Sequence, residues 1–243
     1  MLMKRSVESV YKTSVLPIYS VTPFTMLDFP GRTACIIWFS GCNMRCPYCH
    51  NPQIVKGVGR GNTNQLMTFL RKRAGLLDGV VLSGGEASAY PGLAGLIKEV
   101  KSLGYAVKLD TNGLRPDVVL EFIEQGLLDY VALDYKAPPE KFRQVTGTDK
   151  YDIFSQTLDI LCTQNTVEYE IRTTVHTDLI NENDVSNIIR DLEKRGYTGI
   201  HAIQNFRHSD ERPTLGFLRN QSRVLNLEAL YMPTQFKLEF RNF

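Results

Sequence analysis

The chain has 243 residues and a formal net charge of +2 at neutral pH. Nearly balanced charge gives no reason to expect a nucleic acid or an anionic membrane as partner, and 5 cysteines are too few for a secreted disulfide scaffold of this size. The start, Met1 to Arg5, leads into a polar stretch instead of an apolar signal sequence, and no later apolar run could cross a membrane. We therefore expect a cytoplasmic protein with reduced thiols.

Short apolar runs alternate with amphipathic stretches of helix length, which is typical of β-α units around a parallel sheet. The expected strands are Ala34–Phe39, Gly79–Leu82, Ala106–Asp110, Tyr130–Asp134, Glu168–Val175 and Gly199–Gln204. The expected helices are Asn64–Gly75, Leu93–Leu103, Asp117–Gln125, Ile153–Gln164 and Asn183–Arg195. Alternation over Phe236–Phe240 predicts a terminal strand. In a barrel or a doubly wound sheet alike, the site lies beyond the carboxyl ends of such strands.

A tight loop after the first strand contains Cys42, Cys46 and Cys49 in the spacing C-x3-C-x2-C. A cubic iron-sulfur cluster normally has four thiolate ligands, so three cysteines would leave one iron without a protein ligand. The loop therefore predicts a [4Fe-4S] cluster with one iron open to another molecule.

Three other patterns overlap this loop. Cys46 and Cys49 form the C-x2-C pair of thiol-disulfide enzymes, and His50 completes the C-x2-C-H pattern of haem c attachment. A redox pair normally opens a helix, which Asn51-Pro52 disfavours, and haem attachment needs an exported protein. Zinc accepts three cysteines and a histidine, but Cys49 and His50 are adjacent, whereas structural zinc ligands usually form two separated pairs.

Polar segments also follow the next three strands, at Ser83-Gly84-Gly85-Glu86, Asp110-Thr111-Asn112-Gly113 and Asp134-Tyr135-Lys136. Because the carboxyl ends of parallel strands meet at one edge, these segments should converge on the cysteine loop. Asp110 and Asp134 end neighbouring strands and would repel one another unless a cation or Lys136 lay between them.

With these features the sequence resembles the radical S-adenosylmethionine (SAM) superfamily, and within it the activating enzymes of glycyl-radical proteins. The likeness to activating proteins of anaerobic ribonucleoside-triphosphate reductase rests on Leu27-Asp28-Phe29-Pro30-Gly31-Arg32 and on the segment GCNMRCPYCHNP. It covers roughly residues 25–206 of a single domain over 1–243, with 207–243 as a C-terminal extension. The resemblance implies an α/β fold, a partial (β/α)6 barrel of parallel strands with outer helices.

The same resemblance implies the cofactors. In such enzymes the three cysteines hold a [4Fe-4S] cluster, and its open iron binds the amino and carboxylate groups of SAM. An electron supplied by a small donor protein cleaves SAM to methionine and a 5'-deoxyadenosyl radical, which removes a hydrogen atom from the substrate. The chain would be an oxygen-sensitive oxidoreductase.

Several residues match family positions that bind SAM. Ser83, Gly84, Gly85 and Glu86 are similar to the glycine-glycine-glutamate motif at the methionine end, where glycines allow close backbone approach and Glu86 accepts from the ammonium group. Tyr48 is similar to a residue whose backbone contacts adenine.

Other matches concern charges and the substrate. Asp110, Thr111 and Asp134 resemble ligands of a monovalent cation, and Lys136 resembles the partner of the SAM carboxylate. The family positions that grip the incoming glycyl loop correspond to Asp28 and Arg172, and Gln204 stands where some activating enzymes have a SAM-contacting histidine.

The expected partner is a glycyl-radical enzyme, and anaerobic ribonucleotide reductase is the first candidate. Two alternatives stay open. One is a radical SAM enzyme acting on a small molecule, such as the 7-carboxy-7-deazaguanine synthases of similar size. The other is a zinc-stabilised binding module without catalysis.

Overall fold

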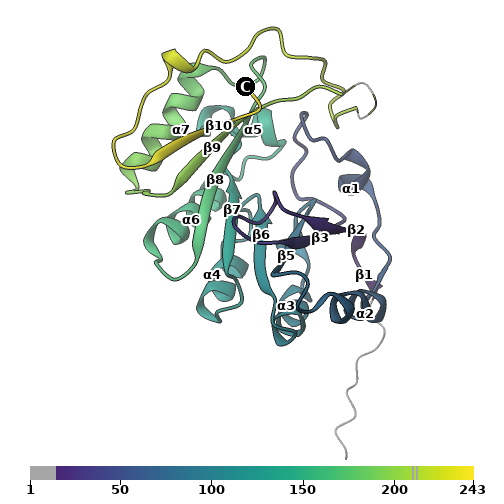
Figure 1. The fold of residues 1–243 in the computed structure, drawn as a ribbon. Helices are drawn as coiled ribbons and strands as arrows, with labels where there is room; N and C mark the ends of the chain where they lie inside the picture. Colours follow the sequence, from purple (N-terminus) through teal and green to yellow (C-terminus); the bar gives the residue numbers. More distant parts are fainter. Residues whose placement is uncertain (1–14, 210, 212) are drawn as a thin grey trace, which may run out of the picture.

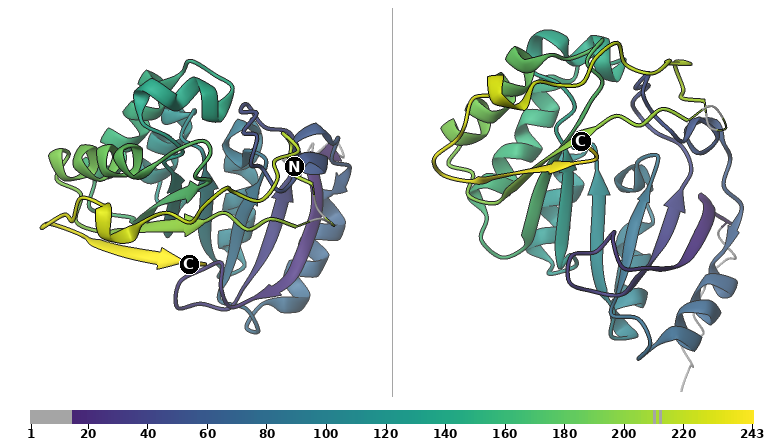
Figure 2. Two further views of the ribbon diagram at one scale, coloured as in Figure 1. Left: turned by 90° about the horizontal axis from the view of Figure 1, so that it is seen from above. Right: turned by 45° about the horizontal axis from the view of Figure 1, so that its top comes forward.

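The chain folds around one curved sheet of eight strands, in the order β10-β9-β8-β7-β6-β5-β3-β2. The structure is a computed structural model that describes residues 15–209, 211 and 213–243. The expectation drawn from Met1 to Arg5 therefore lies outside the described residues. Figure 1 and Figure 2 show the strands side by side, with helices along the outer side of the curve.

The six expected strands form the middle of this sheet and pair in parallel with one another. They are β3 (Ala34–Phe39), β5 (Gly79–Gly84), β6 (Ala106–Thr111), β7 (Tyr130–Asp134), β8 (Glu168–Val175) and β9 (Ile200–Asn205). The five expected helices are α2 (Thr63–Arg73), α3 (Leu93–Ser102), α4 (Pro116–Glu124), α6 (Tyr151–Thr163) and α7 (Glu182–Lys194). The predicted α/β fold with a partial barrel is thus confirmed.

The structure adds two edge strands to the six. Strand β2 (Ile18–Thr25) runs antiparallel to β3, and β10 (Lys237–Arg241) lies parallel to β9. The sequence did not predict β2, because Pro23 interrupts it and exposed and half-buried residues do not alternate cleanly along it. The segment predicted as a terminal strand is β10, displaced by one residue.

Smaller elements were also absent from the sequence expectations. They are the strand pair β1 (Val15–Leu16) and β4 (Gly61–Asn62), the helices α1 (Pro52–Lys56) and α5 (Pro139–Thr146), and the 3-10 turns η1 (Ala87–Ala89) and η2 (Leu227–Ala229). None of the described helices is both long and apolar enough to span a bilayer.

Helix α1 corrects the expectation drawn from Asn51-Pro52. Pro52 is the first residue of the helix, where a proline loses no hydrogen bond, since the first amide of a helix has no intrahelical acceptor. The residues from Cys46 to Cys49 form a turn and do not open a helix. The argument from Pro52 was therefore wrong, although the cysteine pair is still not at a helix start.

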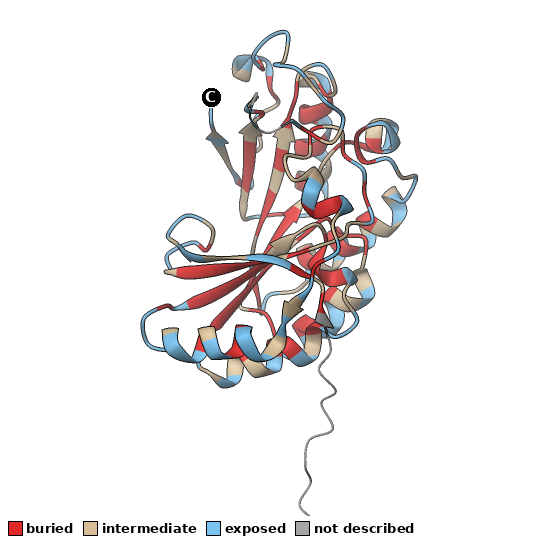
Figure 3. Cartoon of the chain, turned by 90° about the vertical axis from the view of Figure 1, so that its right-hand side faces the viewer, coloured by how far each residue is buried: buried red, intermediate tan, exposed pale blue. Residues whose placement is uncertain are grey.

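Alternate residues of each strand face two different environments. Val80, Leu82 and Val107 belong to the main core under the helices, and Figure 3 shows the buried inner faces of those helices in red. Burial of each such side chain stabilises the fold by about 1.5–3 kcal/mol. The opposite face contributes a second apolar cluster that includes Phe29 and Val81.

This second cluster fills the barrel interior near the amino ends of the strands, because Phe29 precedes β3 and contacts Tyr130 at the start of β7 (ring centroids 6.1 Å apart). The interior is therefore closed at its amino end. Toward the carboxyl ends, the same faces of β5, β6 and β7 carry the polar residues Ser83, Asp110 and Asp134.

The segment from residue 213 onward passes over the carboxyl edge of the sheet before it returns as β10 (Figure 1). There the backbone amide of Leu215 donates to the Cys49 carbonyl oxygen and that of Gly216 donates to the Pro47 carbonyl oxygen, both at a distance of 2.9 Å. The C-terminal segment thus holds one side of the cysteine loop.

Candidate active site

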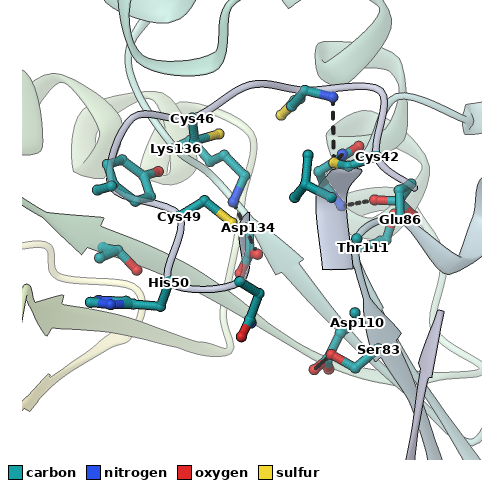
Figure 4. Close-up of a pocket in the computed structure, with 18 of the residues that line it drawn as sticks. Cys42, Cys46, Cys49, His50, Ser83, Glu86, Asp110, Thr111, Asp134 and Lys136 are labelled. Carbon is teal, nitrogen blue, oxygen red and sulfur yellow. Dashed lines mark hydrogen bonds and ion pairs between the residues drawn. The ribbon is translucent and has the colours of Figure 1, made fainter. Parts of the chain in front are cut away.

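A cavity of about 240 Å³ opens at the carboxyl edge of the sheet. Figure 4 shows the cysteine loop above it and the strand-end residues below. The cavity is lined by Trp38, Cys42, Met44, Cys46, Tyr48, Cys49, His50, Asn51, Val55, Ser83, Gly84, Gly85, Glu86, Asp110, Thr111, Asn112, Asp134, Lys136, Arg172 and Thr174. The four segments that were expected to converge therefore share one wall.

Backbone hydrogen bonds fix the cysteine loop at several points. The amide of Gly41 donates to the Ile54 carbonyl (2.9 Å), and that of Arg45 donates to the Thr146 carbonyl (2.7 Å). A turn closed by the Cys49 amide and the Cys46 carbonyl (3.0 Å) brings the last two cysteines to the same side. The loop is held by α1, α5 and the C-terminal segment together.

The three thiols lie in a weakly polar environment. Burial raises the pKa of Cys46 to about 11 and also raises the pKa of Cys42, against the opposing effect of the Lys136 ammonium. The Met44 amide (3.4 Å) and the Asn112 side-chain amide (3.7 Å) donate to Cys42 Sγ. The thiols of Cys42 and Cys46 are therefore hard to ionise and need a bound cation to become thiolates, which metal coordination provides.

The residues present fit a [4Fe-4S] cluster. All five cysteines are free thiols, and the three of the loop share one cavity with amide donors of the kind that stabilise cluster sulfurs. In the described chain, no three His, Cys, Asp or Glu side chains converge on a point where one metal ion could bind.

Gly84 and Gly85 bring the end of β5 against the end of β3. Gly84 has a φ of +123°, and a Cβ there would overlap the Phe39 backbone; a Cβ on Gly85 would overlap the Gly41 carbonyl oxygen. The Gly85 amide donates to the Phe39 carbonyl (2.8 Å) and the Glu86 amide to that of Gly41 (2.9 Å). Only glycine allows these contacts.

The Glu86 carboxylate is buried with a full set of donors around one oxygen. Ser88 donates to Oε1 through its hydroxyl (2.6 Å) and amide (3.2 Å), and Thr111 donates through its hydroxyl (2.8 Å). The Asn112 amide donates to Oε2 (2.7 Å), which leaves capacity for one more donor. Burial raises the pKa of Glu86, and the hydrogen bonds oppose the shift.

Arg172 joins the two aspartates that end neighbouring strands. Its Nε lies 2.9 Å from Asp134 Oδ1 and its terminal nitrogen 3.6 Å from Asp110 Oδ2, while Lys136 Nζ lies 3.2 Å from Asp134 Oδ2. Burial disfavours the charged form of Asp134, but Arg172 and Lys136 outweigh it and lower its pKa to about 2. Figure 4 shows Lys136 reaching past Cys46 and Cys49 toward Asp134.

Most of the predicted site residues line the cavity. The two that do not are Gln204 and Asp28. Gln204 lies beside the wall, where its side-chain oxygen accepts a long hydrogen bond from Thr174 (3.5 Å). Tyr48 is in the wall, and its buried hydroxyl has no hydrogen-bond partner among the described residues.

Asp28 is the second exception. It lies in the connection between β2 and β3, where Thr25 pairs with Ala34 and donates through its hydroxyl to the Asp28 carboxylate. Because β2 is antiparallel to β3, this connection is at the amino edge of the sheet, opposite the cysteine loop. Asp28 does not line the cavity, and its expected role of gripping the incoming glycyl loop stays a prediction.

Asn112 is a site residue that the sequence reasoning did not select. Its side-chain amide donates to Cys42 Sγ and to Asn43 Oδ1 (2.7 Å), so it connects the end of β6 to the cysteine loop. The available signal was its position in Asp110-Thr111-Asn112-Gly113, directly after a strand.

Two curated proteins are similar in sequence to most of this chain. A protein of Methanocaldococcus jannaschii that bears the name of a glycyl-radical enzyme activating enzyme is 32% identical over 202 residues, which are 79% of this chain and 81% of the relative. A pyruvate formate-lyase-activating enzyme of Clostridium pasteurianum is 28% identical over 186 residues, 72% of this chain and 76% of the relative.

A solved structure shares the fold. The structure of anSMEcpe with bound AdoMet superposes with a TM-score of 0.55 at 20% identity, over 69% of this chain and 49% of that chain. The sequence profile of the radical SAM superfamily matches residues 36–196, which run from β3 to α7 and include the three cysteines and Glu86. The chain is a radical SAM enzyme and belongs to the radical SAM superfamily.

Proposed function

We propose that this enzyme generates a glycyl radical on a partner protein. The observation that supports this most is the similarity, over about four fifths of both chains, to a relative named for glycyl-radical enzyme activation. When bound at the cavity, the cluster and SAM supply the radical that removes a hydrogen atom from the glycine.

The cavity offers charges that suit the methionine end of SAM. Glu86 Oε2 has capacity for a donor such as an ammonium group. Lys136 is a half-buried ammonium; partial burial acts to lower its pKa, but Asp134 outweighs this and raises it, so Lys136 stays charged beside a carboxylate. Ser83, Gly84 and Gly85 line the same cavity. Tyr48, from the cysteine loop, would lie along the adenine side.

An open barrel suits a macromolecular substrate. Strands β2 and β10 are the two edges of the described sheet and do not pair with each other, so the barrel has a gap on that side. A glycine loop of a partner could enter there, whereas a small molecule would be better enclosed by a complete wall. We propose anaerobic ribonucleoside-triphosphate reductase as the partner and a small electron-donor protein as the source of electrons, both in the cytoplasm.

The test is anaerobic reconstitution of the chain with iron and sulfide, followed by SAM, dithionite and one candidate partner at a time. The partners are anaerobic ribonucleotide reductase and, because of the Clostridium pasteurianum relative, pyruvate formate-lyase. Electron paramagnetic resonance should show a glycyl doublet with one partner, and none when that partner's glycine is replaced by alanine.

The Cys46→Ala variant is the control for the activator itself and should give no doublet. If the enzyme releases 5'-deoxyadenosine with every partner but no doublet forms, the activator role is refuted and a small-molecule substrate is favoured. A colourless protein that retains one zinc per chain would refute both.

A further inference from the structure

The acid pair Asp110 and Asp134 has a counter-charge that the sequence reasoning did not consider. Lys108 is two residues before Asp110 on β6, so both side chains point into the barrel interior. Its side chain is 2% exposed, and its Nζ lies 2.5 Å from Asp110 Oδ1 and 5.9 Å from the centre of the Tyr130 ring.

Each of the four carboxylate oxygens of this pair thus has a fixed protein cation beside it. Lys108 is at Asp110 Oδ1, Arg172 is at Asp110 Oδ2 and at Asp134 Oδ1, and Lys136 is at Asp134 Oδ2. These are three positive groups against two negative ones. A Na⁺ or K⁺ ion would gain no net attraction from the group and would have to displace a side chain.

The third predicted ligand of a monovalent cation is also engaged elsewhere. The Thr111 hydroxyl donates to Glu86 Oε1 and accepts from the Gly113 amide. Neighbouring residues of a strand point to opposite faces, so this hydroxyl does not lie with the Asp110 carboxylate. The residues present therefore do not fit the predicted monovalent cation.

We propose that Lys108 takes the place of a bound alkali cation in this enzyme and positions Asp110 and Asp134 for SAM binding without one. Lys108 is a positioning residue: it touches Asp110 and acts through it on the wall of the cavity, which Lys108 itself does not line. The inference concerns the site of the proposed function, but it needs neither a partner protein nor a radical.

The test measures SAM binding to the reconstituted, full-length enzyme in KCl, NaCl and tetramethylammonium chloride at equal ionic strength. The last cation is too large to enter the site. Wild-type enzyme should bind SAM with the same Kd in all three salts. The Lys108→Met variant should bind about tenfold more weakly in tetramethylammonium chloride, with affinity recovered in KCl or NaCl, because a small cation can then replace the ammonium.

Two further variants make the result specific. Lys108→Arg keeps the positive charge and should remain independent of the salt. Lys101→Met removes a lysine from an outer ion pair with Asp129 (2.8 Å), whose side chains are about one third exposed, and should behave as wild type.

The thermal unfolding temperature of the same proteins gives a readout that does not require SAM. KCl should raise it for Lys108→Met, relative to tetramethylammonium chloride, and leave the wild type unchanged. The proposal is overturned if wild-type enzyme binds SAM several-fold more tightly in KCl or NaCl, or if Lys108→Met shows no salt dependence. If Lys108→Met does not fold, the wild-type and Lys108→Arg measurements still decide the question.

Discussion

The α-carbon of Gly85 lies against the carbonyl oxygen of Gly41, so no side chain fits at position 85. This contact holds the end of β5 to the first turn of the cysteine loop. Gly85→Ala should therefore force the two segments apart and destabilise the protein by about 1–3 kcal/mol, with loss of bound iron after reconstitution.

Gly95→Ala is the matched control for Gly85→Ala. Gly95 lies within α3, and a Cβ there would meet no atom within 4 Å. Alanine should stabilise that helix by about 0.5–1 kcal/mol. Urea unfolding and iron analysis of both variants check the prediction, and equal iron content in the two would contradict it.

The cysteines of the loop and the other cysteines should differ completely in their effect on metal content. Replacement of Cys42, Cys46 or Cys49 by serine should prevent assembly of about four irons per chain. Cys35 is buried in β3 within the main core, and Cys35→Ala should retain the brown colour and the iron. Anaerobic iron and sulfide analysis measures this, and a Cys49→Ser protein with full iron would contradict the ligand assignment.

Removal of Arg172 should leave the half-buried Asp110 and Asp134 carboxylates without their shared partner, while Lys108 and Lys136 still pair with them. We expect Arg172→Met to lower the free energy of unfolding by about 1.5–3 kcal/mol, because the hydrogen bonds of the guanidinium to charged groups are lost. Arg223→Met removes a comparable two-point contact with Glu182 at the surface and should cost less than about 1 kcal/mol. Similar losses in the two variants would show that burial of Arg172 has no special effect.

The C-terminal segment should slow the loss of the cluster. A Cβ on Gly216 would lie 2.6 Å from Pro47 Cβ, so Gly216→Ala should push this segment off the cysteine loop at a cost of about 1–3 kcal/mol. Iron should then leave faster in the presence of a chelator. Val224→Ala, at an exposed position of the same segment, is the control and should lose iron at the wild-type rate.

His201 should make the stability of the fold depend on pH. It is fully buried, its Nε2 shares a hydrogen bond with the Thr173 hydroxyl (2.8 Å), and burial lowers its pKa from 6.5 to about 3. The unfolded chain therefore takes up a proton that the folded chain refuses between those two pH values. Stability is fully present above pH 6.5 and falls as the pH drops toward 3.

The expected loss of stability follows from the uptake of one proton by the unfolded chain. Between pH 7 and pH 5, wild-type protein without metal should lose about 2 kcal/mol more stability than His201→Gln, measured by urea unfolding. Thr173→Val keeps the histidine and should keep the pH dependence. The same pH profile in wild type and His201→Gln would refute the assignment.

Periodicity in the sequence was sufficient for the middle of the fold. The six parallel strands are short apolar runs, and the five helices are the amphipathic stretches that alternate with them. The predicted ends of these elements lie within two residues of the observed ends. Strand β2 was missed because its residues are mostly exposed or half-buried, and pairing with β3 stabilises it where its own pattern does not. Helix α1 was missed because Pro52 was interpreted as a breaker when it is the first helical residue.

The sequence by itself determined which chemistry this protein performs. Three cysteines lie in one short loop, and glycines followed by Glu86 come after the next strand. The spacing within each segment is enough to indicate the [4Fe-4S] cluster and SAM as ligands, because it is local and does not depend on the rest of the fold.

Only the tertiary structure decided how the charges are paired. Lys108 and Asp110 lie two residues apart on β6, but Arg172 comes from β8 and Lys136 follows β7. The parallel pairing and register of these three adjacent strands bring the charges around the acid pair. The antiparallel direction of β2 likewise placed Asp28 at the far edge. Spacing along a chain fixes local contacts, whereas contacts between distant strands depend on register and direction, which no local pattern encodes.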